Sequence, residues 1–105
     1  MSNFVSIITI TFPSFIAYED WFKRSNDFFL TDKKIKIYLT QNGLKKWTAI
    51  KTEEKEPVKV VAYFEYENKE SFEKCQKIFS KFMPKLSDLI YKSNVVRGNI
   101  VLDEI

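Results

Sequence analysis

The chain has 105 residues, of which 45% are hydrophobic and 30% are charged, and its net charge is +3. This length suits a single domain over residues 1–105, and the hydrophobic content excludes a disordered chain. The charge excess is small, and basic residues are mixed with acidic ones along the chain. This pattern is typical of an ordinary solvated surface, so we expect no nucleic-acid partner.

Histidine is absent and cysteine occurs once, at Cys75. The chain alone therefore cannot build a His-based triad, a His-ligated haem or a thiolate metal cluster, and we expect neither a metal nor a cofactor. A single cysteine forms no intrachain disulfide, and the first residues lack the basic region and cleavage site of a signal peptide. The longest apolar runs are far shorter than the about 20 residues of a membrane span. We expect a cytoplasmic protein without a membrane partner.

The chain begins with a predicted strand and a predicted helix. Residues 4–12 are dense in β-branched and aromatic side chains and predict the strand, which Pro13 ends. Ser14 can cap a helix over residues 15–30, where apolar side chains recur at helical spacing. We interpret the aromatic stripe of this helix as core that faces a sheet.

The sequence of residues 32–42 is compatible with either a strand or a short helix. Their alternating apolar side chains match a strand, whereas Asp32 as an N-cap and Asn42-Gly43 as an ending match a short helix. A type I′ turn at Asn42-Gly43 joining strands 34–40 and 44–51 stays open as an alternative. We favour a short helix, or an irregular segment, followed by a strand over residues 44–51.

The clearest strand prediction in the chain covers residues 58–66, after a loop at residues 52–57. Its alternation separates two faces. One face carries Val60, Ala62 and Phe64, and the other carries Lys59, Val61, Tyr63 and Glu65.

A second helix and a last strand complete the chain. Asn68 can cap the helix, Cys75 lies on its apolar stripe as a small buried hydrophobe, and Pro84 ends it. Residues 86–91 finish as a helical turn. Residues 94–102 predict the last strand, in which Gly98 marks a bulge or a close backbone approach.

The resulting order is β-α-β-β-α-β, with at most one extra element near residue 35. Two split βαβ units in this order predict an α+β, ferredoxin-like fold with a four-stranded antiparallel sheet and two helices on one face. The other face of the sheet then lies open. Counting alternate residues, we expect it to carry Val5, Ile7, Thr9, Thr11, Val61, Tyr63, Val95, Arg97, Asn99 and Val101.

About half of this open face is apolar, which is more than a monomer usually exposes to water. Packing two such sheets face to face in a C2 homodimer would cover it. The sequence therefore predicts that the partner of this chain is a second copy of itself.

Three stretches carry a resemblance to a known family: Gly43-Leu44 before a strand, residues 60–75 (VVAYFEYENKESFEKC) and residues 97–105 (RGNIVLDEI). With them the chain resembles the dimeric α+β barrel superfamily, which includes antibiotic-biosynthesis monooxygenases, EthD-like proteins and haem-degrading monooxygenases. The resemblance implies a ferredoxin-like domain that pairs with a second copy as a dimeric α+β barrel.

Oxygenases of that superfamily typically use an Asn, a Trp and often a His in a pocket between helices and sheet. Asn3 and Trp21 match the first two, but the histidine has no counterpart, which argues against His-bound haem and puts activity in doubt. Asn3, Trp21, Trp47, Tyr63 and Arg97 are our candidates for a pocket that binds a planar aromatic ligand. The resemblance thus implies a cofactor-independent monooxygenase-like or small-aromatic-ligand-binding protein, with catalytic residues unassigned.

Two alternatives of other classes stay open. One is a structural or regulatory homodimer without catalysis. The other is an RNA-binding domain of the RNA recognition motif type, because residues 59–66 (KVVAYFEY) are similar to its RNP1 octamer. Val60 and Val61 replace the glycine and the first stacking aromatic of that octamer, which weakens base stacking. The sequence does not identify the molecule on which the protein acts.

Overall fold

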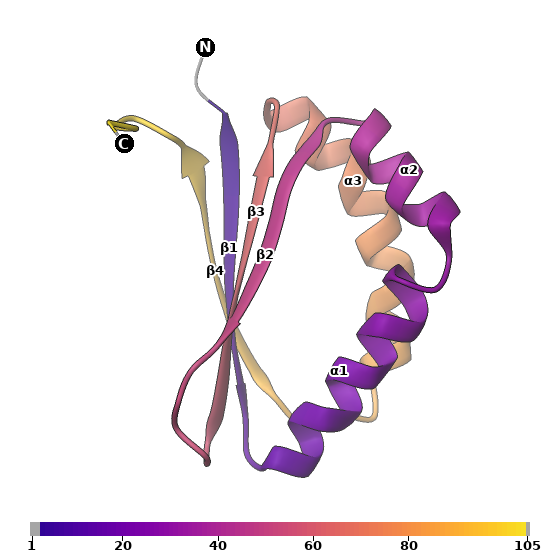
Figure 1. Cartoon of the computed structure of the whole chain (residues 1–105), viewed down its shortest axis with the longest axis vertical. Coiled ribbons are helices and arrows are strands. Elements are labelled where there is room, and N and C mark those ends of the chain that lie inside the picture. The colour runs from indigo at the N-terminus through magenta and orange to yellow at the C-terminus, as the bar shows by residue number, and fades with distance from the viewer. Residues whose placement is uncertain (1–2, 105) are drawn as a thin grey trace.

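The computed structural model describes residues 3–104 and consists of one sheet with the helices on one side of it (Figure 1). Ile105, the last residue of the third stretch that carries the resemblance, lies outside the described residues. The elements in chain order are β1 (Phe4–Phe12), α1 (Phe15–Phe29), α2 (Lys33–Gln41), β2 (Leu44–Lys51), β3 (Val58–Tyr66), α3 (Lys69–Phe82), the 3₁₀-helix η1 (Met83–Leu86) and β4 (Lys92–Asn99).

The sheet is antiparallel throughout, with the strand order β2-β3-β1-β4. The predicted order of strands and helices and the predicted ferredoxin-like fold class are confirmed, and α2 is the extra element near residue 35. None of the described helices is long and apolar enough to cross a lipid bilayer.

Side-chain caps begin the helices where the sequence predicts them. The side chain of Ser14 accepts a hydrogen bond from the backbone N–H of Ala17 at 3.2 Å, and Asn68 accepts one from Ser71 at 2.8 Å. These acceptors satisfy N–H groups that have no partner within the helix. Both predicted caps are confirmed.

Within residues 32–42, the segment compatible with a strand or a helix, the chain forms the helix α2, as we favoured. Asp32 caps it by accepting from the backbone N–H of Lys34 at 2.9 Å. Asn42 has a φ of −96° and Gly43 a φ of +100°, whereas a type I′ turn requires positive φ at both residues. The hairpin alternative is therefore wrong, and Gly43 instead turns the chain from α2 into β2.

The structure corrects two predictions about β4. Val95, Arg97 and Asn99 pair with Ile8, Ser6 and Phe4, so all three lie on the helix side of the sheet and not on the open face. Sequence alternation sets the faces within one strand, but the register between strands is set by the irregular connection before β4, which alternation does not encode. Gly98 lies in a continuous register without a bulge, and a Cβ added there would meet nothing within 4 Å.

The core lies between the helices and the sheet and is rich in aromatic rings. Phe12, Val58 and Tyr66 are almost completely buried on the helix side of β1 and β3. The thiol of Cys75 is also buried, points toward the backbone oxygen of Leu39 at 3.6 Å, and has a raised pKa because it is desolvated. Its prediction as a small buried hydrophobe is confirmed.

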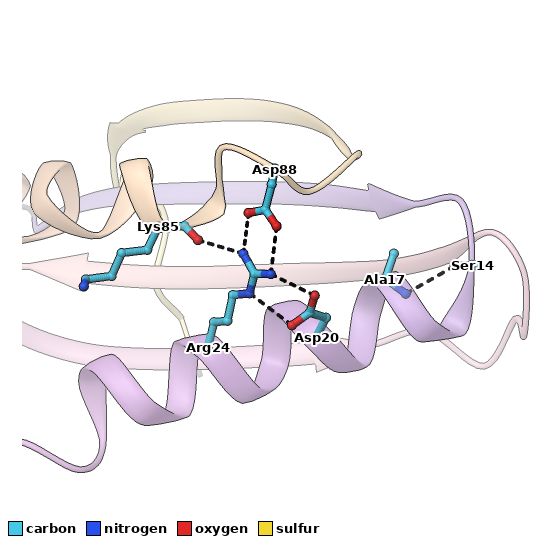
Figure 2. A network of polar contacts seen from close by, with 6 residues as sticks. All are labelled: Ser14, Ala17, Asp20, Arg24, Lys85 and Asp88. Carbon is cyan, nitrogen blue, oxygen red and sulfur yellow. Dashed lines mark hydrogen bonds and ion pairs between the residues drawn. The ribbon is translucent and has the colours of Figure 1, made fainter.

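An arginine joins α1 to the turn that follows α3 (Figure 2). Arg24 donates two hydrogen bonds to Asp20 on its own helix and two to Asp88, and a further one to the backbone oxygen of Lys85. The guanidinium of Arg24 lowers the pKa of Asp88. Since every donor nitrogen of Arg24 has a partner in the chain, we interpret this network as a structural contact between the helices.

Candidate functional site

The face of the sheet opposite the helices carries no described helix (Figure 1). The strand registers place Val5, Ile7, Thr9 and Thr11 of β1 on this open face, as predicted, with Val61 and Tyr63 of β3. The neighbouring strands add Lys46, Thr48 and Ile50 of β2 and Lys92, Asn94, Val96 and Gly98 of β4. Val96 is 68% exposed and Ile50 is 59% exposed, so the open face presents apolar side chains to water.

One end of the open face holds a carboxylate whose two oxygens both have donors. The hydroxyl of Tyr63 donates to Glu65 Oε1 at 2.6 Å, and Asn3 Nδ2 donates to Glu65 Oε2 at 2.7 Å. These bonds, Tyr63 first and Asn3 second, lower the pKa of Glu65. The hydrogen bond between Tyr63 and Glu65 also raises the pKa of Tyr63 to about 12. At neutral pH the carboxylate is therefore charged and the phenol keeps its proton.

The two tryptophans lie on the other side of the sheet. Trp21 of α1 packs on Phe12, with ring centroids 5.3 Å apart. Trp47 of β2 stacks on Phe64 at 5.3 Å and meets the ring of Phe29 edge-on at 5.0 Å. Core side chains thus fill the space beneath Trp21, where the sequence pointed to a pocket.

Arg97 lies at the opposite edge of the sheet from Trp47. Its Nε donates to Ser6 Oγ at 3.3 Å, and its guanidinium lies 4.8 Å from the ring centroid of Phe72. The five predicted pocket residues therefore occupy three places: Asn3 with Tyr63 on the open face, the two tryptophans between α1 and the sheet, and Arg97 at β4. Within one chain they do not line a common pocket.

A shallow groove that the sequence prediction missed lies along one face of α1. Three aromatic residues, Phe15, Tyr18 and Phe22, line it together with Glu19, Lys23, Asn26 and Asp27. All seven residues belong to α1, so the groove is shallow and open to water. The rings of Tyr18 and Phe22 are stacked at 5.8 Å, and Lys51 Nζ lies 5.9 Å from the ring centroids of both Phe15 and Tyr18.

The exposure of these rings separates the groove from the core. Phe15 is 43% exposed and Phe22 is 47% exposed, whereas Phe29 on the same helix is 5% exposed. The sequence held a signal for this difference, because α1 carries aromatic residues on more than one of its faces. A helix that only covers a sheet needs one apolar stripe.

The described part of the chain contains no candidate metal site. Among residues 3–104, no group of three or more Cys, Asp and Glu side chains is placed to hold a metal ion.

Comparison with known proteins adds information on the fold. No protein-family model and no curated protein matches the sequence. The structure is similar to a dimeric ferredoxin-like protein from an uncultured marine organism, with a TM-score of 0.87, 24% identity and coverage of 100% of this chain and 93% of that chain. A second dimeric ferredoxin-like protein of such origin gives a TM-score of 0.70 and 22% identity over 98% of this chain and 99% of that one.

A third similar structure is a candidate antibiotic biosynthesis monooxygenase from Nitrosomonas europaea. It gives a TM-score of 0.63 and 10% identity, with coverage of 93% of this chain and 92% of that chain. At these identities the likeness concerns the fold. The chain shares the ferredoxin-like fold of these structures, which is the fold that the resemblance implies.

Proposed function

We propose that the protein is a homodimer of the dimeric α+β barrel type in which each subunit binds a small planar aromatic molecule in the groove of α1. The observation that carries the binding function is the groove itself, where the exposed rings of Phe15 and Phe22 and the half-buried ring of Tyr18 lie beside charged and amide side chains. Ligand sites commonly combine such an apolar lining with a few polar groups that orient the ligand. The proposed protein is cytoplasmic, in keeping with its single, buried, free thiol.

The homodimer is supported by the open face of the sheet. Val96, Ile50 and Ile7 lie on that face, and no described helix covers them. Two neighbours of similar fold are themselves named as dimeric. A second copy would remove this apolar surface from water, at about 25 cal/mol for each Å² buried.

Titration with 1-naphthol tests the binding function. We expect saturation transfer from the protein to the ligand in NMR for the wild type, and weaker binding by about tenfold for Phe22→Ala, because one ring of the groove is removed. Ile16→Ala is the matched control, since Ile16 lies on the same helix and is 79% exposed outside the groove. Equal binding by Phe22→Ala and Ile16→Ala would contradict the site, and absence of binding would favour a dimer without a ligand.

A monooxygenase-like activity is the second candidate, because one structural neighbour carries such a name. Oxygen consumption with phenols as substrates separates turnover from simple binding. Uptake that Phe22→Ala reduces and Ile16→Ala leaves unchanged would assign the turnover to the groove.

RNA binding has less support from the geometry. On the open face of β1 and β3, Tyr63 is the one aromatic side chain, and it donates to the negatively charged Glu65. A stacking platform for successive bases normally offers several rings on a positively charged surface.

A further inference from the structure

Arg97 is one of two arginines in the chain, and the two guanidinium groups differ in what they contact. Each nitrogen of the Arg24 guanidinium donates to Asp20, Asp88 or the backbone oxygen of Lys85. In Arg97, Nε donates to Ser6 Oγ, but within residues 3–104 neither Nη group donates a hydrogen bond or forms an ion pair. Arg97 therefore presents two charged donor groups that nothing in the described chain accepts.

Two contacts hold the guanidinium of Arg97 in position. Ser6 Oγ accepts from Nε at 3.3 Å, and Ser6 is 2% exposed, so the acceptor is fixed within the sheet. The guanidinium also lies 4.8 Å from the ring centroid of Phe72 on α3. The ring attracts the cation and restricts the plane of the guanidinium. Arg97 thus loses less conformational entropy on binding an anion than an unrestrained surface arginine does.

The surface around Arg97 is open and carries a further polar side chain. Arg97 and Asn99 lie on the helix side of β4 together with Val95, which is 43% exposed. All residues of β4 are exposed, so the described helices leave this side of the strand open to water. Alternate residues of a strand are about 7 Å apart, which places Asn99 and Val95 on either side of Arg97. A second copy packed on the open face would leave this surface accessible, because the two lie on opposite sides of the sheet.

We propose that Arg97 and Asn99 form a binding site for the carboxylate of a small organic acid. The two Nη groups of a guanidinium match the two oxygens of one carboxylate, and the amide of Asn99 donates a further hydrogen bond to it. The apolar part of the acid lies against Val95, which favours an organic acid over inorganic phosphate. The groove of α1 lies beside Lys51 of β2, at the other edge of the sheet, so the two sites are separate.

The two arginine side chains give the test an internal control. In ¹⁵N-labelled protein, Arg24 and Arg97 each give one Nε–Hε signal in NMR, and sodium benzoate is the probe at constant ionic strength. We expect benzoate to shift the Arg97 signal along a saturable curve, with a dissociation constant in the millimolar range. The Arg24 signal should stay in place, because its donors are already used within the chain. Benzamide, which has the ring without the charge, should shift neither signal.

Substitutions separate the parts of the site. Arg97→Lys keeps the charge but removes the planar pair of donors, and we expect benzoate to bind at least about fivefold more weakly, measured at the backbone signal of Gly98. Ser6→Ala removes the acceptor that orients Nε and should weaken binding about threefold. Ser93→Ala is the matched control, since it deletes the same hydroxyl at an exposed residue of β4. Ser93→Ala and Phe22→Ala should both bind benzoate like the wild type.

Several outcomes would overturn the inference. Equal shifts of the two arginine signals, or no shift of either, would show that Arg97 offers no site. Equal binding of benzoate and benzamide, or undiminished binding by Arg97→Lys, would show that the fork of Arg97 does not hold the carboxylate. A shift of the Arg97 signal by inorganic phosphate and not by benzoate would refute the assignment to organic acids. Benzoate binding at Arg97 in a protein that does not bind 1-naphthol would refute the proposed function of the groove alone.

Discussion

At the scale of single residues, the position of Glu65 is the clearest chemical feature of the open face. The carboxylate accepts hydrogen bonds from Tyr63 and Asn3, so it stays charged on a face that mixes apolar and polar side chains. Lys46 Nζ lies 5.9 Å from the ring centroid of Tyr63 and adds a nearby positive charge. A charged group with satisfied hydrogen bonds can lie in an interface, whereas an unsatisfied one would oppose its formation.

Removal of the Tyr63 hydroxyl tests this interpretation of Glu65. In Tyr63→Phe the carboxylate loses its strongest donor, and we expect the pKa of Glu65 to rise toward its ordinary value. Carbon-detected NMR titration of the Glu65 carboxyl measures the shift, and Tyr18→Phe is the control. An unchanged pKa in Tyr63→Phe would contradict the role of the hydroxyl.

The sign of the pH dependence of stability follows from the same shift. Because the folded-state pKa of Glu65 is lowered, its contribution is fully present above its unfolded pKa, near 4.5, and is lost as pH falls through the folded-state pKa. The loss of stability between pH 5 and lower values should therefore be smaller in Tyr63→Phe than in Tyr18→Phe.

At the scale of elements, the sequence predicted each strand and helix that has a clear period or cap. The alternation of residues 58–66 identified β3 and its two faces, and Ser14 and Asn68 marked the starts of α1 and α3. The register of β4 was not predictable, because alternation sets faces within a strand and not the offset between strands. The exposed rings of α1 were taken for core, since the sequence does not show how much of a helix its sheet covers.

The connection between α2 and β2 gives a prediction at this scale. Gly43 has a φ of +100°, and a Cβ there would overlap the side chain of Ser71. We expect Gly43→Ala to lower the free energy of unfolding by about 2 kcal/mol, measured by urea denaturation. Gly98→Ala is the control and should change it by less than about 0.5 kcal/mol, because its Cβ meets nothing within 4 Å. Equal effects of the two substitutions would contradict the structure of this turn.

At the scale of the whole molecule, the described helices cover one face of the sheet and leave the other open (Figure 1). This division was predictable, because the order of strands and helices fixes which face the helices occupy. The site was predictable only in part. Asn3 and Tyr63 do lie together, but Trp21, Trp47 and Arg97 are held elsewhere by core packing and by the register of β4.

The central claim, that a second copy covers the open face, is tested most directly by the mass in solution of the wild type and of Val96→Asp, measured by light scattering. Val96 is 68% exposed on that face, so an aspartate there should leave the subunit folded and place a charge in the interface. We predict twice the 12.5-kDa mass of one chain for the wild type and a single-chain mass for Val96→Asp. A monomeric wild type, or a Val96→Asp variant that dimerises as the wild type does, would contradict the account.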